Sequence, residues 1–239
     1  MSLAFYDATA KVGRWVLREP FWVEMPPTGY EIVFLYSLFI MTPHFQIRAD
    51  YDRDSIVVYQ AYRDAIAKPA IREGRFVEPF SWQRMTWIKP SFLWMMARCN
   101  WTKKSGQENV LAIRIKRTGF DQALTLGVLT MFDQDVHPSE SEWRKEFESA
   151  DVHVQWDPER SVHGKKLLHR SIQVGLSRAV IRQYTDDWIL EIKDCTQFAR
   201  KLREQYLAGN QKRVKQLIPR ERVYPVVDIA VGQRLGMDG

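Results

Sequence analysis

The run SIVVYQAY, residues 55 to 62, constrains the fold of this chain more than any other stretch. Its β-branched and aromatic residues predict a buried strand. A buried strand needs other elements packed around it. The chain has 239 residues, 45% of them apolar, which is enough for one large domain with a good core.

Strand and helix patterns follow one another irregularly along the rest of the chain. Strands are predicted at 55–62, 82–88, 110–116, 152–156, 171–176, 187–192 and 223–228. Helices are predicted at 65–73, 90–99, 120–132, 178–186, 196–209 and 210–217, with one more after the capping box of Ser139 and Glu142. DPER, residues 157 to 160, predicts a turn. We therefore expect an α+β fold of mixed, mainly antiparallel small sheets with packed helices.

The ends of the chain differ from its middle. Residues 1–45 are interpreted as a poorly specified extension, and residues 46–239 as a single α+β domain. The apolar run at 32–41 is half as long as a membrane span, so no membrane segment is expected. Two distant cysteines favour a reduced, cytoplasmic setting, and the histidine spacing predicts no metal site.

The positive charge of the chain is concentrated near its C-terminus. The net charge is +6, and residues 197–224 carry eight Lys and Arg against two Glu. A basic segment of this kind suits RNA or DNA, with Lys212, Arg213 and Lys215 as candidate contacts. A solvated helix face explains the same charge equally well.

The segment RMTWIKPSFLWMM, residues 84 to 96, places cations among aromatic residues. A helix that starts near residue 90 leaves free N–H groups, which favour a phosphate. The candidate ligand-binding side chains are Arg84, Lys89 and Ser91 for phosphate, with Trp87 and Phe92 for stacking. In the alternative interpretation the two cations reach solvent and the aromatic rings fill the core.

Polar side chains also interrupt the predicted strands. Gln60 and Tyr62 share one face of the first strand, because side chains alternate along a strand. Gln173, near Arg170, and Glu191 lie on later strands. Tyr62, Arg170 and Gln173 are further candidates for binding the cofactor. We interpret Gln60 and Glu191 as candidate catalytic groups, with Glu191 as a general base or a stabiliser of positive charge. Sequence motifs of α/β-hydrolases, P-loop proteins and dinucleotide-binding proteins are absent.

Four segments resemble the signature segments of the family known as domain of unknown function 4291. They are IRADYDRDSIVVYQAY, RMTWIKPSFLWMM, VQWDPER and RSIQVGL, and the resemblance runs from Gln46 to Thr196. It implies no established activity.

A weaker resemblance is to the ADP-ribosyltransferase fold, in which a strand, a helix ending in Gly and a strand–loop–helix follow in this order. That resemblance implies an NAD site clamped by an aromatic residue and Ser91, with Glu191 in the place of the late-strand acid. Gln60-Ala61-Tyr62 stands where that fold has its ribose-binding His or Arg.

Three functions remain open at this point. The first is an ADP-ribosyltransferase-like enzyme that binds NAD or a related nucleotide and acts on a nucleic-acid end. The second is a nucleic-acid-binding module without catalytic activity. The third is a structural domain without a small-molecule site.

Overall fold

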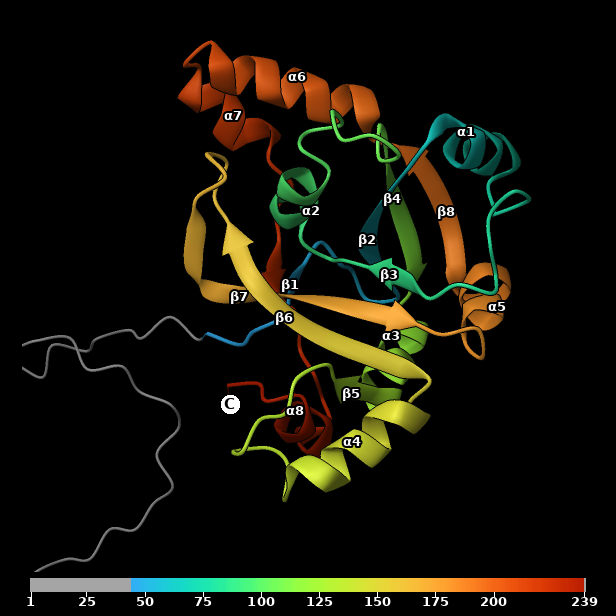
Figure 1. Ribbon diagram of the computed structural model, residues 1–239. Coiled ribbons are helices and arrows are strands. Elements are labelled where there is room, and N and C mark those ends of the chain that lie inside the picture. Colours follow the sequence, from blue (N-terminus) through green and yellow to red (C-terminus); the bar gives the residue numbers. More distant parts are fainter. Residues whose placement is uncertain (1–43, 239) are drawn as a thin grey trace, which may run out of the picture. The chain divides into compact units, whose positions relative to one another are not determined.

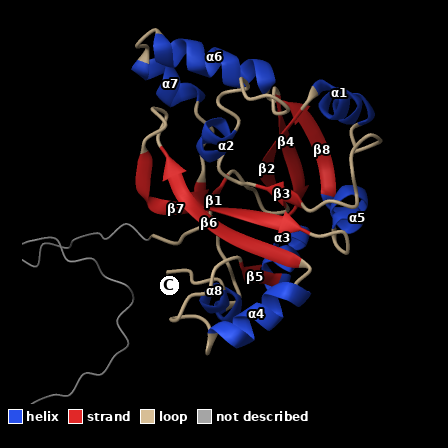
Figure 2. Cartoon of the chain, in the orientation of Figure 1, coloured by secondary structure: helices blue, strands red, loops and turns tan. Residues whose placement is uncertain are grey.

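The strands within residues 44–238 form three small sheets (Figures 1 and 2). The structure is a computed structural model that describes residues 44–238, so the predicted extension at 1–45 lies outside the described residues except for its last two. The strands are β1 (Arg48–Ala49), β2 (Ser55–Tyr62), β3 (Thr86–Ile88), β4 (Asn109–Lys116), β5 (Gly127–Leu129), β6 (Val152–Arg160), β7 (Lys166–Leu176), β8 (Ile189–Asp194) and β9 (Arg222–Val223).

Helices surround these sheets. They are α1 (Asp64–Glu73), α2 (Phe92–Arg98), α3 (Arg117–Leu126), α4 (Glu140–Ser149), α5 (Ile181–Gln183), α6 (Thr196–Leu207), α7 (Gln211–Leu217) and α8 (Ile229–Arg234), with a π-helical turn at Tyr184–Trp188. The sheets have the orders β1-β9, β2-β4-β8 and β3-β7-β6-β5, and only the β5–β6 pair among them is parallel. The expected α+β class with small, mainly antiparallel sheets is confirmed. No helix within residues 44–238 is long and apolar enough to cross a membrane.

Strand β2 has the bounds predicted from its sequence and is buried on both faces. Ile56 and Val58 face the main core, which lies between the larger sheets. Val57 and Tyr59 face a second core, built with α2 and α6. Burial on both sides explains why the apolar run is continuous rather than alternating.

The two larger sheets meet at a single bridge between β2 and the end of β3. The Tyr59 N–H donates to the Lys89 carbonyl oxygen at 2.7 Å. Helix α2 follows this bridge directly in the chain. Lys89 therefore sits where the two sheets and a helix come together.

Several predicted boundaries are wrong. β6 continues through the predicted DPER turn, because β5 pairs only with residues 152–154 and leaves Pro158 on an open edge, where a strand tolerates proline. The helix predicted at 120–132 is α3, which starts at Arg117 and ends at Leu126, where β5 begins. The strand predicted at 223–228 is reduced to the two residues of β9, Arg222–Val223, and the unpredicted helix α8 begins at Ile229. The capping box is confirmed, since the Ser139 hydroxyl accepts from the Glu142 N–H at 3.2 Å.

Candidate functional site

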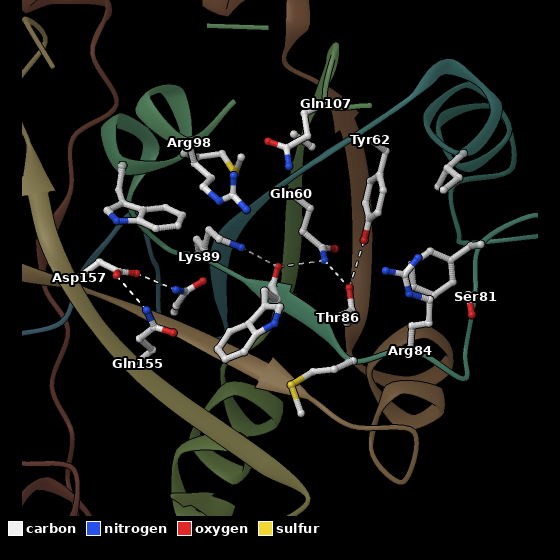
Figure 3. A pocket seen from close by; sticks show the side chains of 18 residues that line it. Gln60, Tyr62, Ser81, Arg84, Thr86, Lys89, Arg98, Gln107, Gln155 and Asp157 are labelled. Atoms are coloured by element: carbon white, nitrogen blue, oxygen red, sulfur yellow. Dashed lines mark hydrogen bonds between the residues drawn. The ribbon is translucent and has the colours of Figure 1, made fainter. Parts of the chain in front are cut away.

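A cavity of about 730 Å³ lies between the two larger sheets (Figure 3). β2 and β3 contribute one part of its wall, β6 and β7 another, and α2 a third. The volume falls within the range of about 300 to 1,000 Å³ that is usual for small-molecule and cofactor sites. Of the residues predicted from the sequence, Gln60, Tyr62, Arg84, Trp87, Lys89 and Gln173 line this cavity.

Gln60 forms the inner wall, and its amide is already engaged. Its Nε2 donates to Thr86 Oγ1 at 2.8 Å and to the Trp87 carbonyl at 3.2 Å. The Tyr184 hydroxyl donates to Gln60 Oε1 at 2.8 Å. With both of its N–H groups used and only 2% of the residue exposed, Gln60 joins β2 to β3 and positions Thr86.

Tyr62 supports the same hydroxyl from the end of β2. Its hydroxyl oxygen lies 3.1 Å from Thr86 Oγ1. Desolvation raises the pKa of Tyr62 well above its usual value, which the hydrogen bond to Thr86 only partly offsets. Tyr62 is therefore neutral at physiological pH and presents a phenol, not a phenolate.

Lys89 is a buried cation in this cavity. Only 7% of it is exposed, and its Nζ donates to the Trp87 carbonyl at 3.2 Å and lies 5.4 Å from the centre of the Trp94 ring. Among the described residues it forms no ion pair. The pKa of Lys89 is lowered to about 7, mainly by desolvation and also by the charge of Arg98, while Asp157 opposes the shift. Such a perturbed group in a cavity is a marker of functional sites.

Asp157 is the carboxylate that lines the cavity. Gln155 Nε2 donates to its Oδ1 at 3.0 Å, and Gln173 Nε2 donates to its Oδ2 at 2.6 Å (Figure 3). The register of the β6–β7 pair explains this cluster, because Gln155 lies directly opposite Gln173. Two amide donors hold the carboxylate in place.

Two arginines complete the positive lining. Arg84, before β3, and Arg98, at the end of α2, are both exposed and lie at the cavity. Neither forms an ion pair within the part of the chain that the structure describes. Gln107 Oε1 is buried at the same cavity without a hydrogen-bond partner. The cavity thus combines three cations, one carboxylate and an unsatisfied acceptor.

The start of α2 is not the anion site that we predicted. The helix begins at Phe92, two residues later than expected, and the Phe92 N–H donates to Glu221 Oε1 at 2.7 Å. The Ser91 hydroxyl accepts from the Trp94 N–H at 3.1 Å. A carboxylate of this chain therefore occupies the position that was expected to receive a phosphate. Lys89 instead reaches the cavity.

Three other predicted residues lie away from the cavity. Phe92 is fully buried in the second core, with its ring centre 5.4 Å from that of Tyr59. Arg170 lies over the ring of Phe45, at 5.9 Å from the ring centre. Ser91 is only 1% exposed and caps α2.

Glu191 lies on the opposite face of its sheet from Gln60. It is paired with Arg114, which is in turn opposite Val57, whereas Gln60 shares a face with Val58. Glu191 instead forms an ion pair with Lys193 at 2.9 Å, and its side chain is 44% exposed. It does not line the cavity.

The basic residues of α7 are separate from this cavity. Lys212, Arg213 and Lys215 are all exposed, and Lys215 alone of the three lines a hollow, which lies between α7 and the β6–β7 turn. Residues 44–238 contain no group of three or more His, Cys, Asp or Glu side chains that could hold a metal ion.

The sequence interpretation missed Arg98 and Asp157. Arg98 ends a helix that was treated as core, and Asp157 fell within the presumed turn. The alternation of Gln155 and Asp157 along one strand face is a signal for Asp157, and no comparable signal marks Arg98.

Two comparisons with known proteins bear on this site. No curated protein matches the chain. Residues 46–224 match a family described as "Domain of unknown function (DUF4291)", and this range includes every residue that lines the cavity. The chain belongs to the family of domain of unknown function 4291.

Proposed function

We propose that this protein is a nucleotide-binding enzyme whose phosphate-bearing ligand, NAD or a related nucleotide, occupies the cavity between the two sheets. The observation that supports the proposal is the charge of the lining. Arg84, Lys89 and Arg98 have no ion-pair partner among residues 44–238, and Asp157 is the one carboxylate beside them. A buried cation without a counter-ion is costly, and an anionic ligand removes that cost.

The cavity offers different contacts to the different parts of a nucleotide. Lys89 and Arg98 are placed to bind phosphate oxygens, and Arg84 is exposed at the cavity. The unsatisfied Gln107 Oε1 is suited to accept a hydrogen bond from a ribose hydroxyl or a base amino group. A phosphate beside Lys89 raises the pKa of that amine, so the ligand binds together with a proton above pH 7.

The catalytic part of the proposal follows the resemblance to ADP-ribosyltransferases. Transfer of ADP-ribose needs a carboxylate beside the ribose, where positive charge develops as the bond to nicotinamide breaks. Glu191 lies on the other sheet face, so we assign this part to Asp157 instead. Gln155 and Gln173 then act as positioning residues for that carboxylate.

The proposal is tested by thermal unfolding with NAD, ADP-ribose, ATP and pyrophosphate. A ligand at about 100 times its Kd stabilises the folded state by about 2.7 kcal/mol. We expect this stabilisation for the wild type and its loss in Lys89→Met and Arg98→Gln. Lys89→Met removes a buried charge, so the variant itself should fold. The matched controls are Lys193→Met and Arg53→Gln, whose native side chains are 66% and 95% exposed.

Calorimetry separates a binding role of Lys89 from a structural one. At pH 8 the wild type should take up close to one proton when the ligand binds, measured in buffers of different ionisation enthalpy, and Lys89→Met should take up none. Asp157→Asn should bind the ligand but lose NAD hydrolysis or transfer. The proposal is contradicted if no nucleotide stabilises the wild type. It is also contradicted if the stabilisation persists unchanged in Lys89→Met and Arg98→Gln.

A further inference from the structure

The nucleotide cavity continues into two further hollows. The second, of about 680 Å³, shares Trp94, Arg98 and Asp157 with the first cavity. The third, of about 520 Å³, shares His163 and Tyr206 with the second. In Figure 1, α6 and α7 lie above α2 and beside the turn that joins β6 to β7. The three hollows form one groove, which leads from the sheets to these two helices.

The groove is positively charged along its length. Arg98, Arg160 and Arg203 line the second hollow, and none of them forms an ion pair within residues 44–238. Asp157 is the one carboxylate there, and the third hollow has Lys215 and no carboxylate. Elsewhere on the surface arginines do find carboxylates, as Arg114 does with Asp52 at 3.0 Å. The groove therefore gathers several cations with one carboxylate among them.

Arg203, which lines the second hollow, carries a buried and unsatisfied donor. Its Nε is buried and has no hydrogen-bond partner, while its guanidinium lies 5.4 Å from the centre of the Trp101 ring. Leaving a buried donor unsatisfied costs about 1 to 3 kcal/mol, so such groups call for a specific explanation. A phosphate oxygen is the acceptor that a guanidinium binds best.

Rings alternate with these cations. His163 Nδ1 lies 2.9 Å from the Tyr206 hydroxyl, and the two ring centres are 5.1 Å apart. His163 is exposed and Tyr206 half-buried, so parts of both rings face the groove. Aromatic faces between cations are typical of sites for single-stranded nucleic acids, where bases stack and arginines bind the phosphates.

The backbone beside Trp101 is held in an unfavourable conformation. Asn100, Trp101 and Thr102 have φ values of 48°, 52° and 68°, in the left-handed region that non-glycine residues rarely adopt. Asn100 and Trp101 line the second hollow. Runs of this kind persist where surrounding contacts hold them, and they cluster at binding sites.

We propose that this groove binds single-stranded nucleic acid, with phosphates on Arg98, Arg160 and Arg203 and a base against His163 and Tyr206. The groove opens into the cavity, so one end of the strand is directed toward the nucleotide. This last part rests on the proposed function, because it makes the strand the acceptor of the transferred group. The binding of the strand does not depend on it.

The test is fluorescence anisotropy with a labelled single strand of about ten nucleotides, as RNA and as DNA. We expect Arg203→Gln to weaken binding on the order of tenfold and to reduce the slope of log K against log salt by about 0.7. The matched control is Lys201→Gln, an exposed cation on the same helix that does not line the groove, which should change affinity less than twofold. If Arg203→Gln unfolds, Arg160→Gln on the strand opposite provides the same comparison.

The outcomes separate this inference from the proposed function. Arg203→Gln should still be stabilised by the nucleotide, and Lys89→Met should still bind the single strand with the affinity of the wild type. Three results would overturn the inference that the groove binds a single strand. They are equal losses of affinity in Arg203→Gln and Lys201→Gln, no binding of either single strand at low salt, and equally tight binding of a duplex or an acidic peptide. If no nucleotide stabilises the protein but the single strand binds in a way that depends on Arg203, only the proposed function is overturned.

Discussion

Lys89 and Glu221 are both desolvated, and their pKa values shift in opposite directions. Desolvation lowers the pKa of Lys89 to about 7, with Arg98 acting in the same direction. The pKa of Glu221 is raised to about 8, mainly by desolvation and also by Glu159 and Asp50, while the hydrogen bond from the Phe92 N–H opposes the shift. Both groups sit next to α2, Lys89 before it and Glu221 at its first N–H. Each makes the folded state sensitive to pH in its own range.

These shifts predict the pH dependence of stability. The raised pKa of Glu221 contributes stability that is present below about pH 4.5 and is lost as the pH rises through 8. The lowered pKa of Lys89 contributes stability that is present above about pH 10.5 and is lost as the pH falls through 7. We therefore expect the free energy of unfolding of Glu221→Gln to rise relative to that of the wild type as the pH increases from 5 to 8. Lys89→Met should be more stable than the wild type at pH 7, and this difference should shrink as the pH increases to 10. Thermal unfolding across this range measures both differences, and differences that do not vary with pH would contradict the assignment.

At the scale of single residues, the sequence predicted polar positions better than it predicted their partners. Gln60 stands out as an amide in an apolar strand, and the structure accounts for it with three hydrogen bonds. Glu191 stands out in the same way but lies on the other face. Which face it takes depends on the register between β4 and β8, which includes an irregularity after Arg114. One strand alone does not reveal that register.

Among the elements, α3 meets the π-helical turn at a glycine. A Cβ at Gly119 would collide with the indole ring of Trp188, which is 3% exposed and cannot move into solvent. Alanine is otherwise the better helix former, by about 1 kcal/mol. The close contact between helix and ring therefore outweighs the helical preference at this position.

This contact predicts opposite effects for two similar substitutions. Gly119→Ala should destabilise the protein by about 1 to 3 kcal/mol, because the packed ring must shift. Gly232→Ala in α8 meets nothing within 4 Å and should be neutral or stabilise by up to about 1 kcal/mol. Urea unfolding of both variants gives the comparison. A Gly119→Ala protein as stable as the wild type would mean that Trp188 is not held against α3.

Helices and strands with strong local sequence signals were predicted well. Those whose boundaries depend on tertiary contacts were not. β2 and the start of α4 were found because a continuous apolar run and a capping box are local features. β3 is only three residues long, since it ends where its pairing with β7 ends. The helix predicted at 178–186 gives way to a π-helical turn at Tyr184, whose hydroxyl reaches Gln60. Such boundaries are decided by tertiary contacts and not by local preference.

At the scale of the whole described chain, the cavity is a product of topology. Its walls come from β2 of one sheet and from β3, β6 and β7 of the other, and β2 and β6 are about a hundred residues apart in the sequence. The sequence predicted the class of fold, but it contained no information on which strands would face each other. The positive groove is also produced by topology, because α2, the β6–β7 turn and α6 meet there.

The single bridge between Tyr59 and Lys89 makes one backbone amide a reporter of sheet separation. If the two sheets part, even briefly, the Tyr59 N–H loses its partner and exchanges with solvent, whereas β4 keeps a strand on either side. We expect the Tyr59 amide to exchange faster than the amides of β4, and a nucleotide in the cavity to slow it selectively. Hydrogen exchange followed by NMR measures this directly, and a bound nucleotide that leaves Tyr59 unchanged would show that the ligand does not hold the sheets together. If the ligand slows this exchange, one residue couples the two events, because the Lys89 carbonyl joins the sheets while its side chain lines the cavity.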